Sequence, residues 1–169
     1  MPNKKRFMYE REDSMDKMIL TDETDIFAFF EVIDQVEASS ILDVGMFLKR
    51  IGSVSRQIKE KEIYPNQRLT GVDFFPEISC PVWEKIYDDI YKPDEIFWTE
   101  NTNQYELAVV LQLEEHMEKN LADCMWQWMS GHVSYILTDW DMKKIENRAE
   151  YKNSLEIRID DKIYHFLIM

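Results

Sequence analysis

The sequence is poor in the residue types that usually form cofactor loops, disulfide frameworks and metal sites. Its 169 residues include only four glycines, two cysteines and three histidines. The cysteines, Cys80 and Cys124, lie far apart, and neither has a neighbour at metal-ligand or redox spacing. Such isolated cysteines are typical of reduced thiols in a cytoplasmic protein.

Long apolar runs are also missing. None is long enough to span a bilayer, and residues 1–25 lack the apolar core of a signal peptide. We therefore expect a soluble, cytoplasmic protein with no membrane partner. Residues 1–24 begin basic and turn acidic, which predicts a charged, flexible N-terminal arm before a single domain over residues 25–169.

Positively charged residues are also few. Twenty Lys and Arg residues stand against 33 Asp and Glu residues, so the net charge is -13. Nucleic-acid binding depends on basic side chains that displace counterions from phosphates, and the charge therefore argues against DNA or RNA as a partner. Apolar residues are plentiful at 45%, enough for the core of one domain.

Strand and helix patterns alternate along the chain. Helices are expected at residues 26–36, 47–59 and 114–129, the last ending at a left-handed Gly131. Strands are expected at residues 41–44, 68–72, 82–87, 105–113, 133–137, 155–159 and 163–168. The last two flank Asp160 and Asp161 and predict an antiparallel hairpin. The pattern predicts a Rossmann-like α/β fold: a doubly wound, mainly parallel sheet with helices on both faces and a C-terminal hairpin.

Acidic residues follow three successive predicted strands. Asp43 and Gly45 close the first, Asp73 the second, and Asp88 and Asp89 the third. Ligands of such sheets bind outside the carboxyl ends of the strands, where carboxylates can accept hydrogen bonds from ribose hydroxyls or an adenine amino group. Turn chemistry alone explains any single Asp, but the set with Gly45 predicts a nucleoside-like ligand.

The chain resembles the class I S-adenosylmethionine-dependent methyltransferases over residues 26–137. Residues 41–45, Ile-Leu-Asp-Val-Gly, resemble the first motif of that family. Residues 69–73, Leu-Thr-Gly-Val-Asp, resemble its second motif, and residues 87–90 its third. Residues 105–117 are similar to the fourth strand, which commonly runs into Leu-Glu-His. The resemblance implies the methyltransferase fold and an S-adenosylmethionine site.

The resemblance also implies roles for particular residues. Asp43 would organise the amino group of the cofactor through water, Gly45 would face its methionine part, and Asp73 would hold its ribose. Either Asp88 or Asp89 would meet the adenine. The floor beneath the sulfonium would be formed by Gln112, Leu113 and Glu114.

The first motif departs from the family pattern. The family usually has two more glycines, but here Phe47 and Lys49 stand at those positions, which predicts weak or lost cofactor binding. Phe47 has helical spacing to Ile51 and Val54, so we expect its ring to turn onto the sheet and leave the crevice open.

Two functions follow from these features. One is a methyltransferase that acts on an unidentified small molecule, with His116 as candidate general base and Trp140 at the border of the pocket. For His116, packing or capping is the competing interpretation. The other is a catalytically inactive methyltransferase-fold protein that serves as a binding or scaffold partner. A homo-oligomer is a further expectation, because a second subunit could complete the site of so short a chain.

Overall fold

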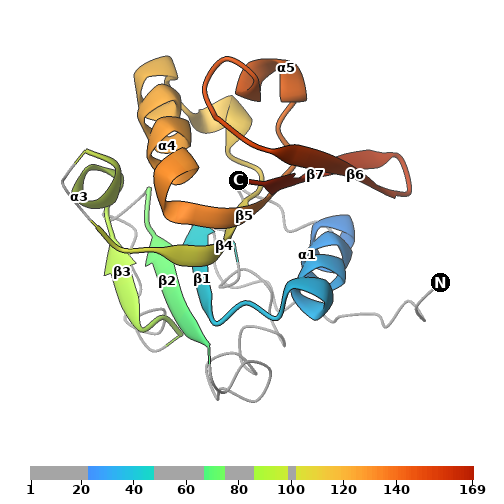
Figure 1. Cartoon of the computed structure of the whole chain (residues 1–169), viewed down its shortest axis with the longest axis horizontal. Coiled ribbons are helices and arrows are strands. Elements are labelled where there is room, and N and C mark those ends of the chain that lie inside the picture. Colours follow the sequence, from blue (N-terminus) through green and yellow to red (C-terminus); the bar gives the residue numbers. More distant parts are fainter. Residues whose placement is uncertain (1–22, 48–66, 75–85, 99–101) are drawn as a thin grey trace, which may run out of the picture.

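A computed structural model describes residues 23–47, 67–74, 86–98 and 102–169 (Figure 1). Within these ranges the chain forms a seven-stranded sheet in the order β3-β2-β1-β4-β5-β7-β6. The strands are β1 Ser40–Val44, β2 Arg68–Val72, β3 Asp89–Tyr91, β4 Tyr105–Val110, β5 Val133–Thr138, β6 Asn153–Ile159 and β7 Lys162–Ile168. Strands β1 to β5 are parallel, whereas β7 runs antiparallel to both β5 and β6. The predicted fold class is therefore confirmed, including the C-terminal hairpin.

Helices cover both faces of the sheet. They are α1 Glu23–Val36, α3 Pro93–Phe97, the 3-10 turn η5 Glu114–His116, α4 Lys119–His132 and α5 Met142–Ile145. Helix α1 packs on the face near β5, β6 and β7, while α4 and α5 lie across the other face (Figure 1). The helix expected over residues 47–59 lies almost wholly within residues 48–66, outside the described ranges.

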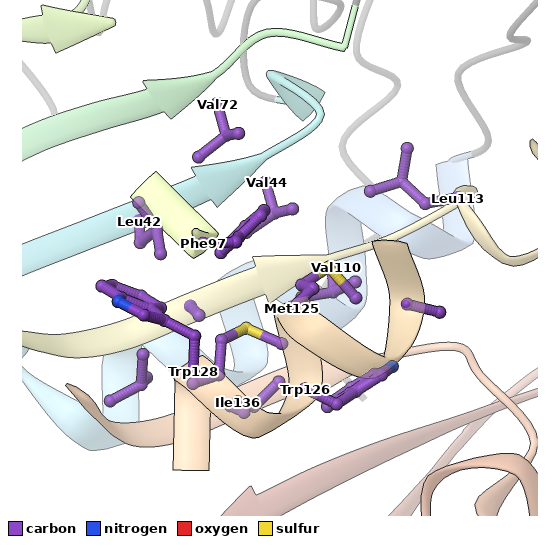
Figure 2. Packing of buried hydrophobic residues seen from close by; sticks show 14 of the residues in the cluster. Leu42, Val44, Val72, Phe97, Val110, Leu113, Met125, Trp126, Trp128 and Ile136 are labelled. Carbon is purple, nitrogen blue, oxygen red and sulfur yellow. The ribbon is translucent and has the colours of Figure 1, made fainter. Parts of the chain in front are cut away.

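Alternating side chains of the central strands feed two separate cores. Ile41 of β1 belongs to the core that contains Phe29 of α1 on one face, whereas Leu42 belongs to the core that contains Trp126 of α4 on the other. Figure 2 shows this second core, in which α4 lies over β1 and β4. Burial on both faces explains why residues 107–110 of β4 are all apolar.

Helix α4 differs from its predicted span. It begins at Lys119 because Met117 and Glu118 have extended backbone angles, which break the chain after η5. It also continues through Gly131 to His132, so the predicted left-handed cap at Gly131 is wrong. Val133 ends the helix instead, with its N–H donating to the carbonyl of Met129.

The third strand is shorter and later than predicted. Strand β3 begins at Asp89, and its register places Asp89 beside Thr70 and Tyr91 beside Val72. Asp88 therefore precedes β3 and Asp89 is its first residue, so both lie at the amino end of the strand. The prediction that they close a strand is wrong. Residues 82–85 of the predicted strand lie outside the described ranges.

Both of these acids are engaged at that amino end. Leu69 N–H donates to Asp88 Oδ2 at 2.9 Å, and Arg68 Nε donates to Asp89 Oδ2 at 3.0 Å. Their side chains fix the start of β2 against the start of β3. The basis for assigning them to an adenine ring is lost.

Candidate functional site at the carboxyl edge of the sheet

The carboxyl ends of four adjacent strands are level with one another. Val44 of β1 pairs with both Val72 of β2 and Val110 of β4, and Val110 pairs with Thr138 of β5. The residues that follow these strands therefore meet along one edge. They are Gly45 after β1, Asp73 after β2, Gln112 and Leu113 after β4, and Asp139 after β5.

Gly45 makes the turn that leaves β1. Its φ is +86°, a left-handed conformation that favours glycine, and its N–H donates to the carbonyl of Val72 at 2.9 Å. A Cβ at this position would lie 2.8 Å from Leu113 Cδ2. Gly45 is thus required both by backbone conformation and by the close approach of Leu113.

Asp43 lies beneath this turn and is fully buried. Its Oδ1 accepts the Phe47 N–H at 2.9 Å, and its Oδ2 accepts the Tyr87 hydroxyl at 2.6 Å. Both carboxylate oxygens therefore accept hydrogen bonds from other residues of the protein, and these bonds stabilise the turn from below.

Phe47 is fully buried on the α1 side of the sheet, where its ring meets that of Phe29 edge-on at 6.4 Å. The expectation that this ring packs onto the sheet is confirmed. Lys49, the other departure from the glycine pattern, lies outside the described residues.

Asp73 follows β2 and is nearly buried, with 6% of its surface exposed. Its N–H donates to the carbonyl of Tyr91 at 2.8 Å, which joins the ends of β2 and β3. Phe74, Tyr91 and Met117 are half-buried around the same core that contains Leu113. Phe74 follows Asp73 in the chain and Tyr91 ends the strand beside β2, so these two side chains form an apolar rim near Asp73 and can flank a flat ring.

Sequence reasoning missed this rim. Phe74 follows Asp73 directly and Tyr91 ends β3. The argument that residues at strand ends line the site, which identified the acidic residues, applies to these two aromatic residues as well. Tyr91 was hidden because the third strand was placed too early in the chain.

Gln112 occupies a left-handed conformation, with a φ of +60°. Its N–H donates to Asp139 Oδ2 at 3.1 Å, and its side-chain amide donates to Asp25 Oδ2. Side-chain and main-chain bonds therefore hold this unusual backbone conformation from two directions.

Asp25 is the buried centre of this polar cluster. It accepts hydrogen bonds from the Tyr164 hydroxyl and from Gln112, and Lys162 Nζ lies 3.3 Å from its Oδ1. Asp25 has no exposed surface, whereas Gln112, Asp139 and Lys162 are partly exposed. The cluster thus has a buried centre, Asp25, and a partly exposed side formed by the other three residues.

Asp139 is the group in this cluster suited to proton transfer. Burial raises the pKa of its carboxyl to about 6, with a further upward effect from the charge of Asp25. The Gln112 N–H and the Lys162 charge act in the opposite direction. A carboxylate with such a pKa is a better proton acceptor near neutral pH than an ordinary Asp.

Two sequence candidates lie apart from this cluster. His116 is exposed in η5, and its ring makes no hydrogen bond to any described residue, although its backbone N–H donates to the carbonyl of Leu113 at 3.1 Å. Trp140 is 2% exposed and packs on Trp126, with ring centroids 5.4 Å apart, rather than bordering an open pocket.

The described ranges contain neither a metal-binding cluster nor a membrane-spanning helix. No group of three or more His, Cys, Asp or Glu side chains there could hold a metal ion. No helix in the described ranges has the length and apolarity needed to cross a bilayer.

Comparison with solved structures identifies the architecture. A Nostoc punctiforme protein assigned as an O-methyltransferase superimposes with a TM-score of 0.60 at 12% identity, over 92% of this chain and 58% of that protein. The methyltransferase domain of the bacterial CtHen1 gives a TM-score of 0.60 at 14% identity, over 89% of this chain and 100% of that domain. The chain has the class I S-adenosylmethionine-dependent methyltransferase fold.

A third methyltransferase aligns in the same way. Human N-acetylserotonin methyltransferase, in a complex with S-adenosylmethionine, gives a TM-score of 0.54 at 10% identity, over 86% of this chain and 51% of that protein. This chain therefore spans little more than half the length of two of the three methyltransferases and the whole of the CtHen1 domain. By sequence, no protein-family model and no curated protein matches it.

Proposed function

We propose that the protein is an S-adenosylmethionine-dependent methyltransferase that acts on a small molecule. The observation that carries the proposal is the placement of Gly45 and Asp73 after adjacent parallel strands of a methyltransferase fold. A carboxylate after β2 can accept hydrogen bonds from both ribose hydroxyls, and a glycine after β1 permits close approach to the backbone.

The residues at the carboxyl edge fit an adenosine-containing cofactor. Asp73 would hold the ribose, and Phe74 and Tyr91 would flank the adenine in place of Asp88 or Asp89. S-adenosylmethionine would supply a methyl group activated by a positively charged sulfur. The burial of Phe47 on the opposite side of the turn supports an open crevice, because its ring takes no volume above Gly45.

Leu113 is the residue that most limits this fit. Its side chain packs against Gly45 and is 2% exposed. For the methionine part to reach the backbone at Gly45, the Leu113 side chain has to rotate away. We therefore expect weak binding that improves when this side chain is shortened.

The polar cluster around Asp25 would receive the methyl acceptor. Gln112 and Asp139 follow β4 and β5, so they lie beside the crevice that Gly45 and Leu113 border. Asp139 would take the proton that a hydroxyl or amine acceptor loses as it is methylated. The net charge of -13 favours a small molecule over a nucleic acid as this acceptor.

Calorimetric titration with S-adenosylhomocysteine tests the proposal, because this ligand reports on the pocket without turnover. Saturable one-to-one binding in the wild type, lost in Asp73→Ala, is the expected result. If Asp73→Ala binds as tightly as the wild type, the ribose assignment fails. If neither the wild type nor Leu113→Ala binds at millimolar ligand, the assignment as a methyltransferase fails.

A further inference from the structure

Strand β6, Asn153–Ile159, is an open edge of the sheet. Strand β7 covers one of its sides, and no strand of the described residues pairs with the other. The opposite edge is β3, which has only three residues. The outer side of this seven-residue strand presents a row of N–H and C=O groups that can pair with another strand.

An apolar strip leads across the sheet to this edge. The rings of Tyr135 on β5 and Phe166 on β7 are stacked, with centroids 5.5 Å apart and planes 10° apart. Phe166 pairs in register with Leu155 on β6, and Leu155 is 51% exposed. An apolar strip that ends on an exposed leucine at a free strand edge is suited to protein contact.

The side chains of β6 alternate between the two faces of the sheet. Leu155, Ile157 and Ile159 share the face that α1 partly covers, since Ile157 and Ile159 pack against its core. Glu156 and Arg158 lie on the other face, where Arg158 Nε is 2.5 Å from Glu156 Oε1. Both charged side chains are well exposed, at 45% and 69%.

A second copy of β6 is complementary to the first in one register. A twofold axis perpendicular to the sheet relates the two copies and keeps each side chain on its own face. Each possible register is then defined by the one residue that lies opposite the same residue of the second copy. Centred on Glu156 or Arg158, the pairing opposes two like charges. Centred on Leu155, it opposes Ile157 to the polar Asn153.

The register centred on Ile157 removes these conflicts. Glu156 then faces Arg158 of the second copy, and by symmetry this pair occurs twice. Leu155 faces Ile159 of the second copy on the apolar face. At the ends of the strand, the acidic turn of Asp160 and Asp161 faces Ser154 and Asn153, so no like charges meet.

We propose that the protein forms a symmetric homodimer in which two copies of β6 pair antiparallel about Ile157 and join the two sheets edge to edge. The dimer pairs the outward-facing backbone groups of β6 and extends the apolar strip into the second copy. It turns the single Glu156 and Arg158 pair into an alternating row of four charges. This surface lies away from Asp73 and does not depend on the proposed function.

Charge reversal tests the register. Sedimentation equilibrium of the full chain should show a dimer, and Glu156→Arg or Arg158→Glu should each weaken it about tenfold, because each places two like-charge pairs at the interface. The double variant E156R/R158E restores opposite charges and should regain the wild-type dimer. Glu146→Arg, at the exposed residue that follows α5, makes the same change in net charge as Glu156→Arg but away from β6, and should leave the dimer unchanged.

Cysteine cross-linking locates the axis independently. In a chain with Cys80 and Cys124 replaced by serine, Ile157→Cys should oxidise to a disulfide-linked dimer, because residue 157 faces its own copy. Ser154→Cys on the same strand should not, because it faces Asp160. A wild type that is monomeric at its highest soluble concentration overturns the proposal. A dimer that keeps its affinity in both single variants, or is not restored in the double variant, overturns it too.

Discussion

Leu113 lies directly against the open side of Gly45, so that a single added methyl group on Gly45 would come within 2.8 Å of it. The two residues follow neighbouring strands, β1 and β4, and together close the carboxyl edge of the sheet. A ligand that approached the backbone at Gly45 would therefore require the Leu113 side chain to move. This pair gives the sharpest tests of the site.

Gly45→Ala should destabilise the fold by about 1–3 kcal/mol, because the new Cβ is strained at a φ of +86° and collides with Leu113. Leu113→Ala should cost about 2–5 kcal/mol as a buried leucine truncation. The double variant should be more stable than the sum of the two losses predicts, because the collision is gone. Urea unfolding of the four proteins measures this coupling, and simple additivity would show that the contact carries no energy.

Asp73→Ala should abolish binding of S-adenosylhomocysteine, because the ribose loses its acceptor at the end of β2. Asp89→Asn is the matched control, since it changes an acid on the neighbouring strand at the opposite edge of the sheet. We expect Asp89→Asn to bind the ligand as the wild type does. Equal losses in both variants would indicate general damage to the sheet rather than a ribose contact.

Tyr87→Phe should destabilise the protein by about 1–3 kcal/mol, because it removes a buried hydrogen bond to the carboxylate of Asp43. The effect should shrink in an Asp43→Asn background, where the acceptor carries no charge. Thermal and urea unfolding of the four proteins measures the difference. An unchanged cost of Tyr87→Phe in that background would mean that the tyrosine stabilises the turn through packing alone.

Asp139 gives the protein a predictable pH dependence. Its pKa is about 6 in the folded protein and near the ordinary value of 3.8 when unfolded. Between about pH 4 and pH 6, Asp139 is deprotonated in the unfolded protein but still protonated in the folded protein. The free energy of unfolding therefore falls as the pH rises through this range and stays constant above it. The full effect is on the order of 2–3 kcal/mol.

Asp139→Asn removes this titration while keeping an oxygen to accept the Gln112 N–H. The variant should be more stable than the wild type at pH 7, and the gain should vanish near pH 4. Urea unfolding at several pH values from 4 to 8 measures it. A difference that does not change with pH would show that the Asp139 pKa is not raised by folding.

Much of the fold follows from local pattern. The strands at β1, β2 and β5 and the terminal hairpin were predictable because their apolar residues are bounded by turn residues. Strand β3 was not, because it has only three residues, begins with Asp89 and has no fully buried side chain. The stretch before it is more apolar and drew the prediction toward it.

The site divides in the same way. Gly45 and Asp73 follow strands that local pattern identifies, so their positions could be predicted. Asp25 could not be connected to the site, because its partners Lys162 and Tyr164 lie 137 and 139 positions away in the chain. Asp139 follows β5 directly, so the strand-end pattern that identified Asp73 also applies to it.

The hydrogen bonds that Gln112 makes through both its main chain and its side chain limit how the protein can be redesigned. Its main chain is tied to Asp139 and its side chain to Asp25, so a substitution there would loosen α1, β4 and β5 together. The exposed residues just beyond it, Glu115 and His116, carry no such ties among the described residues. A library at this end of β4 can vary those two positions and should keep Gln112 fixed.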